Sequence, residues 1–244
     1  MKTAAIIPAR FGSTRFPGKP LALLGGKPVI QHVWERAVQS KADTVLVATD
    51  DERIFRTVES FGGKAVMTRS DHPSGSDRIW EAAGPLDAEI ILNIQGDEPM
   101  IPPSVIDGLI DLMAEGTAEI GTVVVPVRRC DVEKNPNLPK VVVSADGFAI
   151  YFSRSMIPYL REGGEEMPKL YRHWGIYAYR REALKKFVSL PPGALEKCEK
   201  LEQLRALENG MRFKVLETAF QTIGIDTPED LKNAEALLAS GGVK

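Results

Sequence analysis

The sequence predicts an α/β protein built on a doubly wound, mostly parallel sheet with an antiparallel insertion. Two observations indicate the parallel sheet: short continuous apolar runs, such as residues 4–8 and 44–49, and amphipathic stretches between them. Strands that are buried on both faces have such runs, and each parallel crossover needs a helix. A third observation, Asp146-Gly147 between two apolar runs, predicts a β-hairpin inside the insertion.

The first half of the chain alternates strands with helices. Val29, Val33 and Ala37 recur at the four-residue spacing of an amphipathic helix. Ser76, before Asp77, is predicted to be the N-cap of the third helix. From these patterns we expect strands at 4–8, 44–49, 65–67 and 89–95, and helices at 28–40, 52–61, 77–83 and 104–114.

The regular alternation of predicted strands and helices ends after about residue 120. The hairpin at 141–152 is the clearest new element, and Thr227 followed by Pro228 predicts the start of a last helix. We expect one domain, residues 1–244, with an insertion around 128–190. The other predicted elements are strands at 121–127, 174–179 and 213–217, loops at 131–140 and 157–169, and helices at 182–189 and 197–209.

The composition is that of a globular protein, with 43% hydrophobic and 26% charged residues. A net charge of −2 gives no reason to expect a nucleic-acid partner. No apolar run is long enough to cross a bilayer, and the first residues do not form a signal peptide, so we expect no membrane and a cytoplasmic location. Cys130 and Cys198 lack metal-ligand spacing and are expected to be free thiols.

Residues 10–19, which we call the basic loop, follow the first predicted strand directly. Arg10, Arg15 and Lys19 stand there among small residues, and residues 1–34 contain no acid. Guanidinium groups bind phosphate bidentately, and small residues let the main chain approach a ligand. The loop lacks the glycine patterns of dinucleotide folds and P-loops, which disfavours an NAD-dependent dehydrogenase. The pattern favours a triphosphate ligand over its alternative, a basic surface turn.

Asp97 follows an apolar strand at its carboxyl end, where open α/β sheets bind ligands. Mg²⁺ needs oxygen ligands on a rigid backbone. Asp97 is therefore a candidate magnesium ligand, and a solvated turn is the alternative.

Seven segments, in order along nearly the whole chain, carry a specific pattern. They are IIPARFGSTRFPGKPL, MTRSDHPSGSDR, NIQGDEPMIP, AIYFSRSMIPY, RHWGIYAYR, LEKCEKLEQLRALENG and GIDTPEDL. Together they resemble the 3-deoxy-manno-octulosonate cytidylyltransferase (CMP-Kdo synthetase) family, whose fold is that of the nucleotide-diphospho-sugar transferases. Sialate, pseudaminate and methylerythritol-phosphate cytidylyltransferases are less similar in the QGDEP, FSRS and LEQLR regions.

The resemblance implies transfer of CMP from CTP to the eight-carbon acidic sugar 3-deoxy-D-manno-octulosonate (Kdo), for lipopolysaccharide biosynthesis. It also implies Mg²⁺ as cofactor and a homodimer, with the insertion around 128–190 at the interface and at the sugar. One alternative is the same chemistry on 8-amino-Kdo or a sialic-acid-like sugar. Another is a non-catalytic sugar-nucleotide sensor.

The resemblance also implies which residues form the site. Arg10, Arg15, Lys19, Asp97 and Asp226 would be catalytic, with Asp97 and Asp226 as the magnesium ligands. CTP would contact Pro8, Ala9, Arg10, Lys19, Ser74, Gly75, Ser76 and Arg78. The sugar acid would contact Arg15, Gln95, Arg154, His173, Tyr177, Glu202 and Gln203. Helix capping is the alternative for the Ser74–Arg78 segment and for Asp226, and an ordinary core or surface position is the alternative for the sugar ligands.

Overall fold

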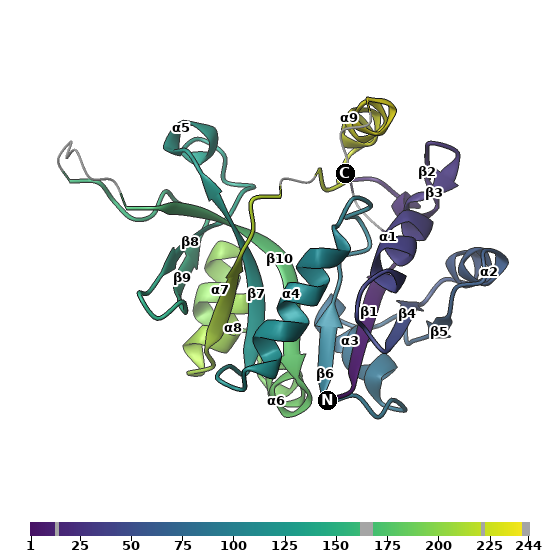
Figure 1. Ribbon diagram of the computed structural model, residues 1–244, viewed down its shortest axis with the longest axis horizontal. Helices are drawn as coiled ribbons and strands as arrows, with labels where there is room; N and C mark the ends of the chain where they lie inside the picture. Colours follow the sequence, from purple (N-terminus) through teal and green to yellow (C-terminus); the bar gives the residue numbers. More distant parts are fainter. Residues whose placement is uncertain (13–14, 162–167, 221–222, 241–244) are drawn as a thin grey trace. The chain divides into compact units, whose positions relative to one another are not determined.

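Figure 1 shows the computed structural model, which describes residues 1–12, 15–161, 168–220 and 223–240. Ser13 and Thr14 of the basic loop, and much of the loop predicted at 157–169, lie outside the described residues. The chain folds into two units. The first unit is Met1–Ile110 with Gln221–Lys244, and the second is Asp111–Phe220. The expectation of a single domain stays a prediction.

A parallel sheet forms the centre of the first unit. Ile6 in its middle strand lies opposite Leu46 on one side and Asn93 on the other. β1 and β6 are buried along almost their whole length, which is why their sequences are continuously apolar. The strands are β1 (Thr3–Ala9), β4 (Thr44–Thr49), β5 (Ala65–Met67) and β6 (Ile90–Asn93), in the order β6-β1-β4-β5.

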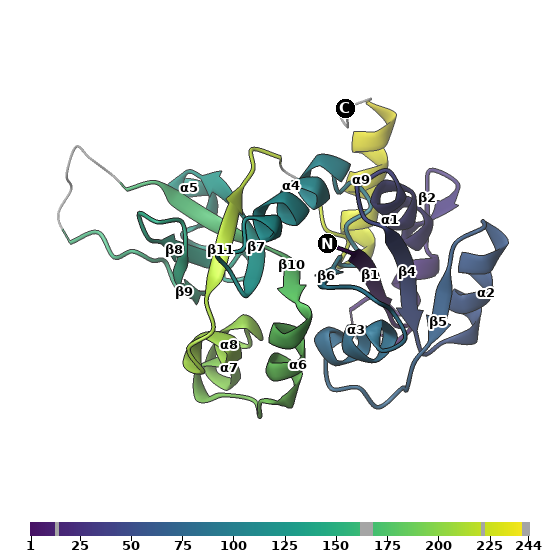
Figure 2. The ribbon, with the colours of Figure 1, turned by 60° about the horizontal axis from the view of Figure 1, so that its bottom comes forward.

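Helices cover both faces of this sheet. Right-handed crossovers that run in opposite directions along a sheet place their helices on opposite faces. In the order β6-β1-β4-β5, the crossover from β1 to β4 runs toward β5, and the crossover from β5 to β6 runs the opposite way. Their helices, α1 and α3, both pack against β1 and β4 and so lie on opposite faces (Figure 2). The helices against these strands are α1 (Val29–Val38), α2 (Glu52–Ser60) and α3 (Gly75–Ala83). Of the remaining helices, α4 (Pro103–Ala114) begins in the first unit and ends in the second, and α9 (Pro228–Ala239) packs against the strand at Leu23–Leu24. The predicted doubly wound fold is confirmed.

The start of α3 differs from the prediction. Ser74, and not Ser76, is the N-cap, because its side chain accepts a hydrogen bond from the backbone N–H of Asp77. The Asp77 carboxylate accepts from the Ser74 hydroxyl at 2.7 Å, and with Ser74 as the N-cap the helix begins at Gly75. Ser76 lies within the first turn and is buried.

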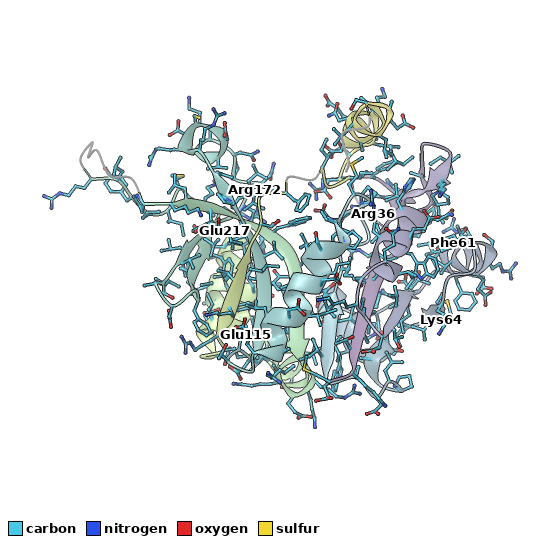
Figure 3. The ribbon with its side chains drawn as sticks, in the orientation of Figure 1. Arg36, Phe61, Lys64, Glu115, Arg172 and Glu217 are labelled. Atoms are coloured by element: carbon cyan, nitrogen blue, oxygen red, sulfur yellow. The ribbon has the colours of Figure 1, made fainter. Side chains whose placement is uncertain are left out.

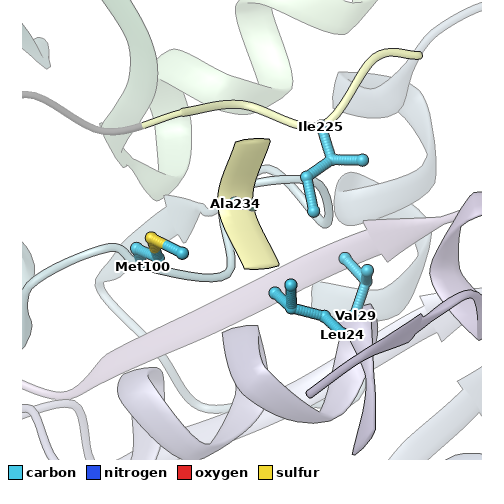
Figure 4. Close-up of a cluster of buried hydrophobic side chains, with 5 residues drawn as sticks. All are labelled: Leu24, Val29, Met100, Ile225 and Ala234. Atoms are coloured by element: carbon cyan, nitrogen blue, oxygen red, sulfur yellow. The ribbon is translucent and has the colours of Figure 1, made fainter. Parts of the chain in front are cut away.

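An apolar cluster joins the beginning and the end of the chain within the first unit (Figure 4). Leu24 and Val29 meet Met100 from the loop after β6, and Ile225 and Ala234 from the last segment. All five side chains are buried. The segment before α9 is therefore fixed beside the loop after β6. Leu24 belongs to a small hairpin, β2 (Leu23–Leu24) and β3 (Lys27–Pro28), which follows the 3₁₀ helix η1 (Lys19–Leu21).

The second unit is built around β7 (Ile120–Val127). This strand pairs in parallel with β11 (Phe213–Glu217) and antiparallel with β10 (Leu170–Arg180). β8 (Lys140–Val143) and β9 (Ala149–Ser153) form the predicted hairpin, and β8 also pairs with β10. The antiparallel part of the fold prediction is therefore confirmed. Glu217, labelled in Figure 3, accepts a hydrogen bond from the Tyr171 hydroxyl at 2.8 Å, which joins the end of β11 to the start of β10.

The helices of the second unit correct two predictions. The single helix predicted at 197–209 is wrong: α7 (Ala194–Glu199) and α8 (Gln203–Glu208) are separated at Lys200, whose φ of 52° ends α7. The loop predicted at 131–140 overlaps a short helix, α5 (Arg129–Val132). The predicted helix at 182–189 is present as α6 (Arg181–Ser189). Among the helices of the described residues, none is long and apolar enough to cross a membrane.

Candidate active site

The basic loop leaves the carboxyl end of β1 and is closed by a glycine. The N–H of Gly18 donates to the carbonyl of Phe11 at 2.9 Å. Gly18 has a φ of 72°, which favours glycine, and a Cβ there would lie 3.0 Å from the Phe11 ring. Arg10 and Arg15 are exposed, whereas Lys19 is largely covered. The loop therefore returns close to its own start before η1 begins.

Backbone hydrogen bonds bring Asp97 and Asp226, which we call the carboxylate pair, into one place. The N–H of Ile225 donates to the carbonyl of Asp97 at 2.9 Å, while the Ile225 side chain is buried in the cluster of Figure 4. Thr227 is the N-cap of α9, as predicted, and forms a capping box with Asp230. The carboxylate of Asp230 also accepts from the backbone N–H of Asp226 at 3.0 Å. Capping is thus performed by Thr227, and not by the side chain of Asp226.

Two cations of the basic loop contact the carboxylate pair. Nζ of Lys19 lies 2.6 Å from Oδ2 of Asp97 and 3.2 Å from Oδ1 of Asp226. Nη2 of Arg15 lies 3.0 Å from the same Asp226 oxygen. The Lys19 side chain is only 13% exposed, so this ammonium is screened less by water than an ordinary surface lysine would be. The structure therefore brings four of the five predicted catalytic residues into direct contact.

The carboxylate pair has the chemistry of a magnesium site. Two carboxylates that converge on one cation supply the hard oxygen ligands that Mg²⁺ prefers. Among the described residues there is no group of three or more His, Cys, Asp or Glu that could enclose a metal by itself. Mg²⁺ usually takes one or two carboxylates and completes its shell with water and substrate phosphates. Asp97 and Asp226 fit an ion of this kind.

Two glycines from different segments, Gly75 and Gly96, approach Pro8 at the carboxyl edge of the sheet. A Cβ on Gly96 would lie 2.9 Å from the Pro8 carbonyl oxygen, and a Cβ on Gly75 would lie 3.7 Å from Pro8 Cγ. At Gly96 only a residue without a side chain lets the loop after β6 come this close to β1, whereas a Cβ at Gly75 would make an ordinary van der Waals contact with Pro8. Pro8, Ala9, Ser74 and Gly75, all predicted to contact CTP, therefore come from segments that meet here.

Arg78 is buried and bonded within the protein. Its Nη2 lies 3.0 Å from Oδ2 of Asp50, and its Nη1 donates to the hydroxyl of Thr68. The Thr68 hydroxyl in turn donates to the carbonyl of Thr49 at 3.1 Å. These contacts join α3 to the carboxyl end of β4. A direct contact of Arg78 with the nucleotide stays a prediction.

The predicted sugar ligands divide between the units. Arg15 and Gln95 belong to the first unit, and the amide of Gln95 donates to the side chain of Asn93 at 3.4 Å. The others belong to the second unit: Arg154, His173, Tyr177, Glu202 and Gln203. Glu202 is half-buried at the start of α8.

His173 and Tyr177 lie four positions apart on β10 and face each other. Their rings lie 5.5 Å apart although β10 has a bulge between Trp174 and Tyr177. His173 pairs with Val124 and Tyr177 pairs with Thr122 on β7. Val124 and Thr122 are two residues apart, so they point to the same face of the sheet, and their partners His173 and Tyr177 do so as well despite the bulge.

A chain of hydrogen bonds defines the protonation of His173. The single hydroxyl proton of Thr122 goes to the carbonyl of Ile176 at 2.8 Å, so Nε2 of His173 must donate to the Thr122 oxygen at 2.9 Å. Nδ1 then accepts from the Gln203 amide at 3.3 Å, and the amide oxygen of Gln203 accepts from the Tyr177 hydroxyl at 3.3 Å. Every group is satisfied with a neutral imidazole.

Burial agrees with this arrangement. It lowers the pKa of His173 to about 3, with a smaller contribution from the charge of Arg172, and it raises the pKa of Tyr177. Both ring nitrogens of His173 have protein partners, so its role as a sugar ligand stays a prediction.

Arg154 is held by main-chain carbonyls at the end of β9. Its Nε donates to Glu199 at 2.6 Å, Nη1 to Pro136 at 2.8 Å and Nη2 to Lys200 at 3.1 Å. The Glu199 carboxylate accepts from the Arg154 backbone N–H at 2.9 Å. Lys140, which is buried, donates from Nζ to the Arg154 carbonyl at 2.7 Å, and burial lowers the pKa of this lysine. The contact of Arg154 with a sugar carboxylate stays a prediction.

Sequence reasoning missed the residues that hold these side chains. Thr122, Lys140 and Glu199 were not singled out, because each has an unremarkable neighbourhood in the sequence. For Lys140 the available signal was its place at the head of the apolar run 141–143, because a lysine at the start of a strand that begins in the core is buried only if its ammonium has partners.

The fold and the site together define a class of protein. A doubly wound sheet that carries a basic loop and a carboxylate pair at its carboxyl edge is suited to nucleotide phosphates and a divalent cation. The chain belongs to the cytidylyltransferase family, whose profile matches residues 4–213.

Relatives within this family are named for a specific sugar substrate. A 3-deoxy-manno-octulosonate cytidylyltransferase of Thermodesulfovibrio yellowstonii is 54% identical over 98% of this chain and 98% of its own. One from Geobacter sulfurreducens is 49% identical over 95% of this chain and 97% of its own. The resemblance that the motifs predicted is therefore confirmed.

Solved structures agree with the sequence relatives. The structure of CMP:2-keto-3-deoxy-manno-octonic acid synthetase complexed with CTP matches with a TM-score of 0.94 and 44% identity, over 99% of this chain and 100% of that chain. A 4-diphosphocytidyl-2C-methyl-D-erythritol synthase from Anaerococcus prevotii has a TM-score of 0.65 at 18% identity, covering 98% of this chain and 96% of that chain. This second likeness concerns the fold alone.

Proposed function

We propose that this chain transfers CMP from CTP to Kdo, giving CMP-Kdo and pyrophosphate, with Mg²⁺ as its cofactor. The observation that carries the proposal is the contact between the basic loop and the carboxylate pair. It occurs in a chain that is 54% identical over nearly its full length to a protein named for this reaction.

The basic loop is suited to the triphosphate of CTP. Arg10 and Arg15 are exposed, so their guanidinium groups are accessible to a phosphate and can bind it bidentately. Lys19 supplies a compact third charge. The segments that carry Pro8, Gly75 and Gly96 meet at this edge of the sheet, where main-chain groups would read the edge of the base by hydrogen bonds.

Asp97 and Asp226 would hold the Mg²⁺. When bound, the ion supplies charge neutralisation at the phosphates and lowers the pKa of a hydroxyl beside it. The two carboxylates contribute a fixed position, because the Ile225 N–H and the capping box of α9 restrain the backbone on each side of Asp226.

The reaction is an in-line displacement at phosphorus. The anomeric hydroxyl oxygen of the sugar forms a bond to the α-phosphorus of CTP, and the bond from this phosphorus to the bridging α–β oxygen breaks. Pyrophosphate leaves with that electron pair, and the hydroxyl proton passes to solvent. Arg10, Arg15 and Lys19 orient the triphosphate and offset the charge that develops on it, so the protein acts mainly by positioning and electrostatics.

Three further expectations accompany the reaction. We propose that the product serves lipopolysaccharide biosynthesis, because the curated relatives carry the Kdo-specific name. Homodimer formation through the region around 128–190 and a cytoplasmic location stay predictions from the sequence.

Pyrophosphate release tests the proposal. The purified chain is incubated with CTP and Kdo, with and without Mg²⁺, and then with ATP, GTP or UTP in place of CTP. We expect release only with Mg²⁺, with CTP well ahead of the purine nucleotides and UTP second. Parallel reactions with 8-amino-Kdo and a sialic acid identify the preferred sugar. Equal turnover of ATP and CTP, or no turnover with any sugar, contradicts the proposed function.

A further inference from the structure

The ring of Phe11, which follows Arg10 directly, lies under an arginine from a different element. Cζ of Arg53, in the first turn of α2, is 3.4 Å from the centroid of the Phe11 ring. At this distance the guanidinium is stacked on the aromatic face and makes a cation–π contact. The same ring also packs against Gly18, where a Cβ would lie 3.0 Å away. Phe11 is thus a point where both ends of the basic loop and α2 meet.

Arg53 is itself held in a defined orientation. The carboxylate of Asp51 accepts from Nε at 2.9 Å and from Nη2 at 2.6 Å, a bidentate pair that fixes the plane of the guanidinium. Asp51 is the N-cap of α2, and its own N–H donates to the hydroxyl of Thr49 at 3.2 Å. A continuous set of contacts therefore runs from the carboxyl end of β4, through Asp51 and Arg53, to the ring of Phe11.

The rest of the loop shows why this contact matters. The far end of the loop is anchored by Pro20, which is buried, and by Phe16, which packs against the cluster of Figure 4. Arg10 lies just beyond β1 and is exposed, so its direction depends on the residue that follows it. Because Phe11 is only half-buried, the core does not fix its ring, and the stack with Arg53 supplies the missing restraint.

We propose that Arg53 is a positioning residue: by holding Phe11 it keeps the Phe11 ring against Gly18 and presents Arg10 to the CTP triphosphate. This inference rests on the proposed function, because it takes CTP as the ligand of the basic loop. Arg53 touches neither substrate nor metal in this role. Its effect passes through the conformation of the loop alone.

The experiment measures CTP affinity by isothermal titration of the full chain in the presence of Mg²⁺. For an exposed cation–π contact we expect Arg53→Ala to weaken CTP binding about three- to fivefold, and KM for CTP to rise similarly while kcat changes little. Arg53→Lys should retain only part of the CTP affinity that Arg53→Ala loses, because an ammonium group cannot bind Asp51 bidentately and also stack on the Phe11 ring. Phe11→Tyr keeps the ring and should bind CTP like the unmodified chain.

The matched control is Arg56→Ala. Arg56 lies on the same helix, is 76% exposed and pairs with Glu52 at 2.9 Å, so its removal changes the charge of α2 in the same way. We expect its CTP affinity to be unchanged. Phe11→Leu should weaken binding as Arg53→Ala does, and the double variant should be little worse than either, because both changes break one contact.

Three results would overturn the inference: normal CTP affinity in Arg53→Ala, an equal loss in Arg56→Ala, or full additivity with Phe11→Leu. A role confined to the stability of α2 would lower the melting temperature of Arg53→Ala and leave its CTP affinity intact, which also counts against the inference. Failure of the unmodified chain to bind CTP would instead contradict the proposed function.

Discussion

Lys19 occupies the oxygens that the proposed Mg²⁺ would need, so its removal should raise metal affinity while it lowers activity. Its ammonium contacts both members of the carboxylate pair, at 2.6 and 3.2 Å. In Lys19→Gln the positive charge is lost and a polar side chain remains. We expect this variant, without nucleotide, to bind a divalent ion more tightly than the unmodified chain. With CTP and Kdo it should turn over slowly, because a phosphate contact is gone.

The magnitude follows from Coulomb's law with a protein-like dielectric. An ammonium and a divalent ion about 4 Å apart repel by about 8 kcal/mol at an effective dielectric constant of 20, twice the value for two unit charges. Movement of the lysine side chain away from the entering metal would relieve most of this repulsion. We retain about a sixth, roughly 1.4 kcal/mol, which corresponds to about a tenfold gain in affinity.

Manganese binding gives a direct readout. Mn²⁺ replaces Mg²⁺, and the free ion is followed by electron paramagnetic resonance during titration of the nucleotide-free chain. Lys27→Gln is the control, because Lys27 pairs with Glu35 at 2.9 Å, not with Asp97 or Asp226, and its substitution removes the same charge. Equal Mn²⁺ affinity in Lys19→Gln and the unmodified chain would refute the reasoning, as would an equal gain in Lys27→Gln.

Three further predictions follow from the same structure. Asp226→Asn should keep its melting temperature, because Thr227 caps α9, and should lose about 10²-fold or more in turnover with partial recovery at high Mg²⁺; full activity at low Mg²⁺ would remove Asp226 from the metal site. Gly96→Ala places a methyl group 2.9 Å from the Pro8 carbonyl and should destabilise the fold by about 1–3 kcal/mol in urea unfolding, whereas Gly12→Ala, with nothing within 4 Å, should not. His173 has a pKa of about 3 when folded and an ordinary value near 6.5 when unfolded, so the unfolded state takes up the proton first as the pH falls. Stability should therefore drop by up to about 1.4 kcal/mol per pH unit from pH 6.5 towards 3, and the slope should be shallower in His173→Asn; identical slopes in the two proteins would contradict the neutral, buried imidazole.

The sheet of the first unit was predictable because each strand is decided by a local pattern. β4 begins and ends where its apolar run does, since burial on both faces requires such a run. β5 also matches its apolar run, although it is only half-buried and ends at the exposed Met67. The break between α7 and α8 was not predictable in this way. Residues 197–209 have the pattern of one charged helix, and the interruption at Lys200 is compensated by a contact that local sequence does not reveal, the buried pair of Arg205 and Glu196 at 2.7 Å.

The site was predictable to a similar extent. The cations of the basic loop and Asp97 follow apolar strands directly, so their composition and place indicated a phosphate and metal site. Asp226 came from family resemblance alone, because it meets Lys19 across 207 positions of sequence. That encounter depends on the Ile225 N–H and on the burial of its side chain, neither of which leaves a local signal. The stack of Arg53 on Phe11 was missed for the same reason.

The order of the carboxylate pair along the chain has a consequence during synthesis. The whole second unit, Asp111–Phe220, lies in sequence between Asp97 and Asp226. When residue 220 leaves the ribosome, β1, β4, β5 and β6 have all been made, but only Asp97 of the carboxylate pair exists. At that stage Leu24 and Val29 also lack their packing partners Ile225 and Ala234. The last stretch to emerge covers this apolar surface and supplies the second carboxylate in one event. A nascent chain therefore cannot hold both carboxylates of the proposed metal site before the whole second unit has been made.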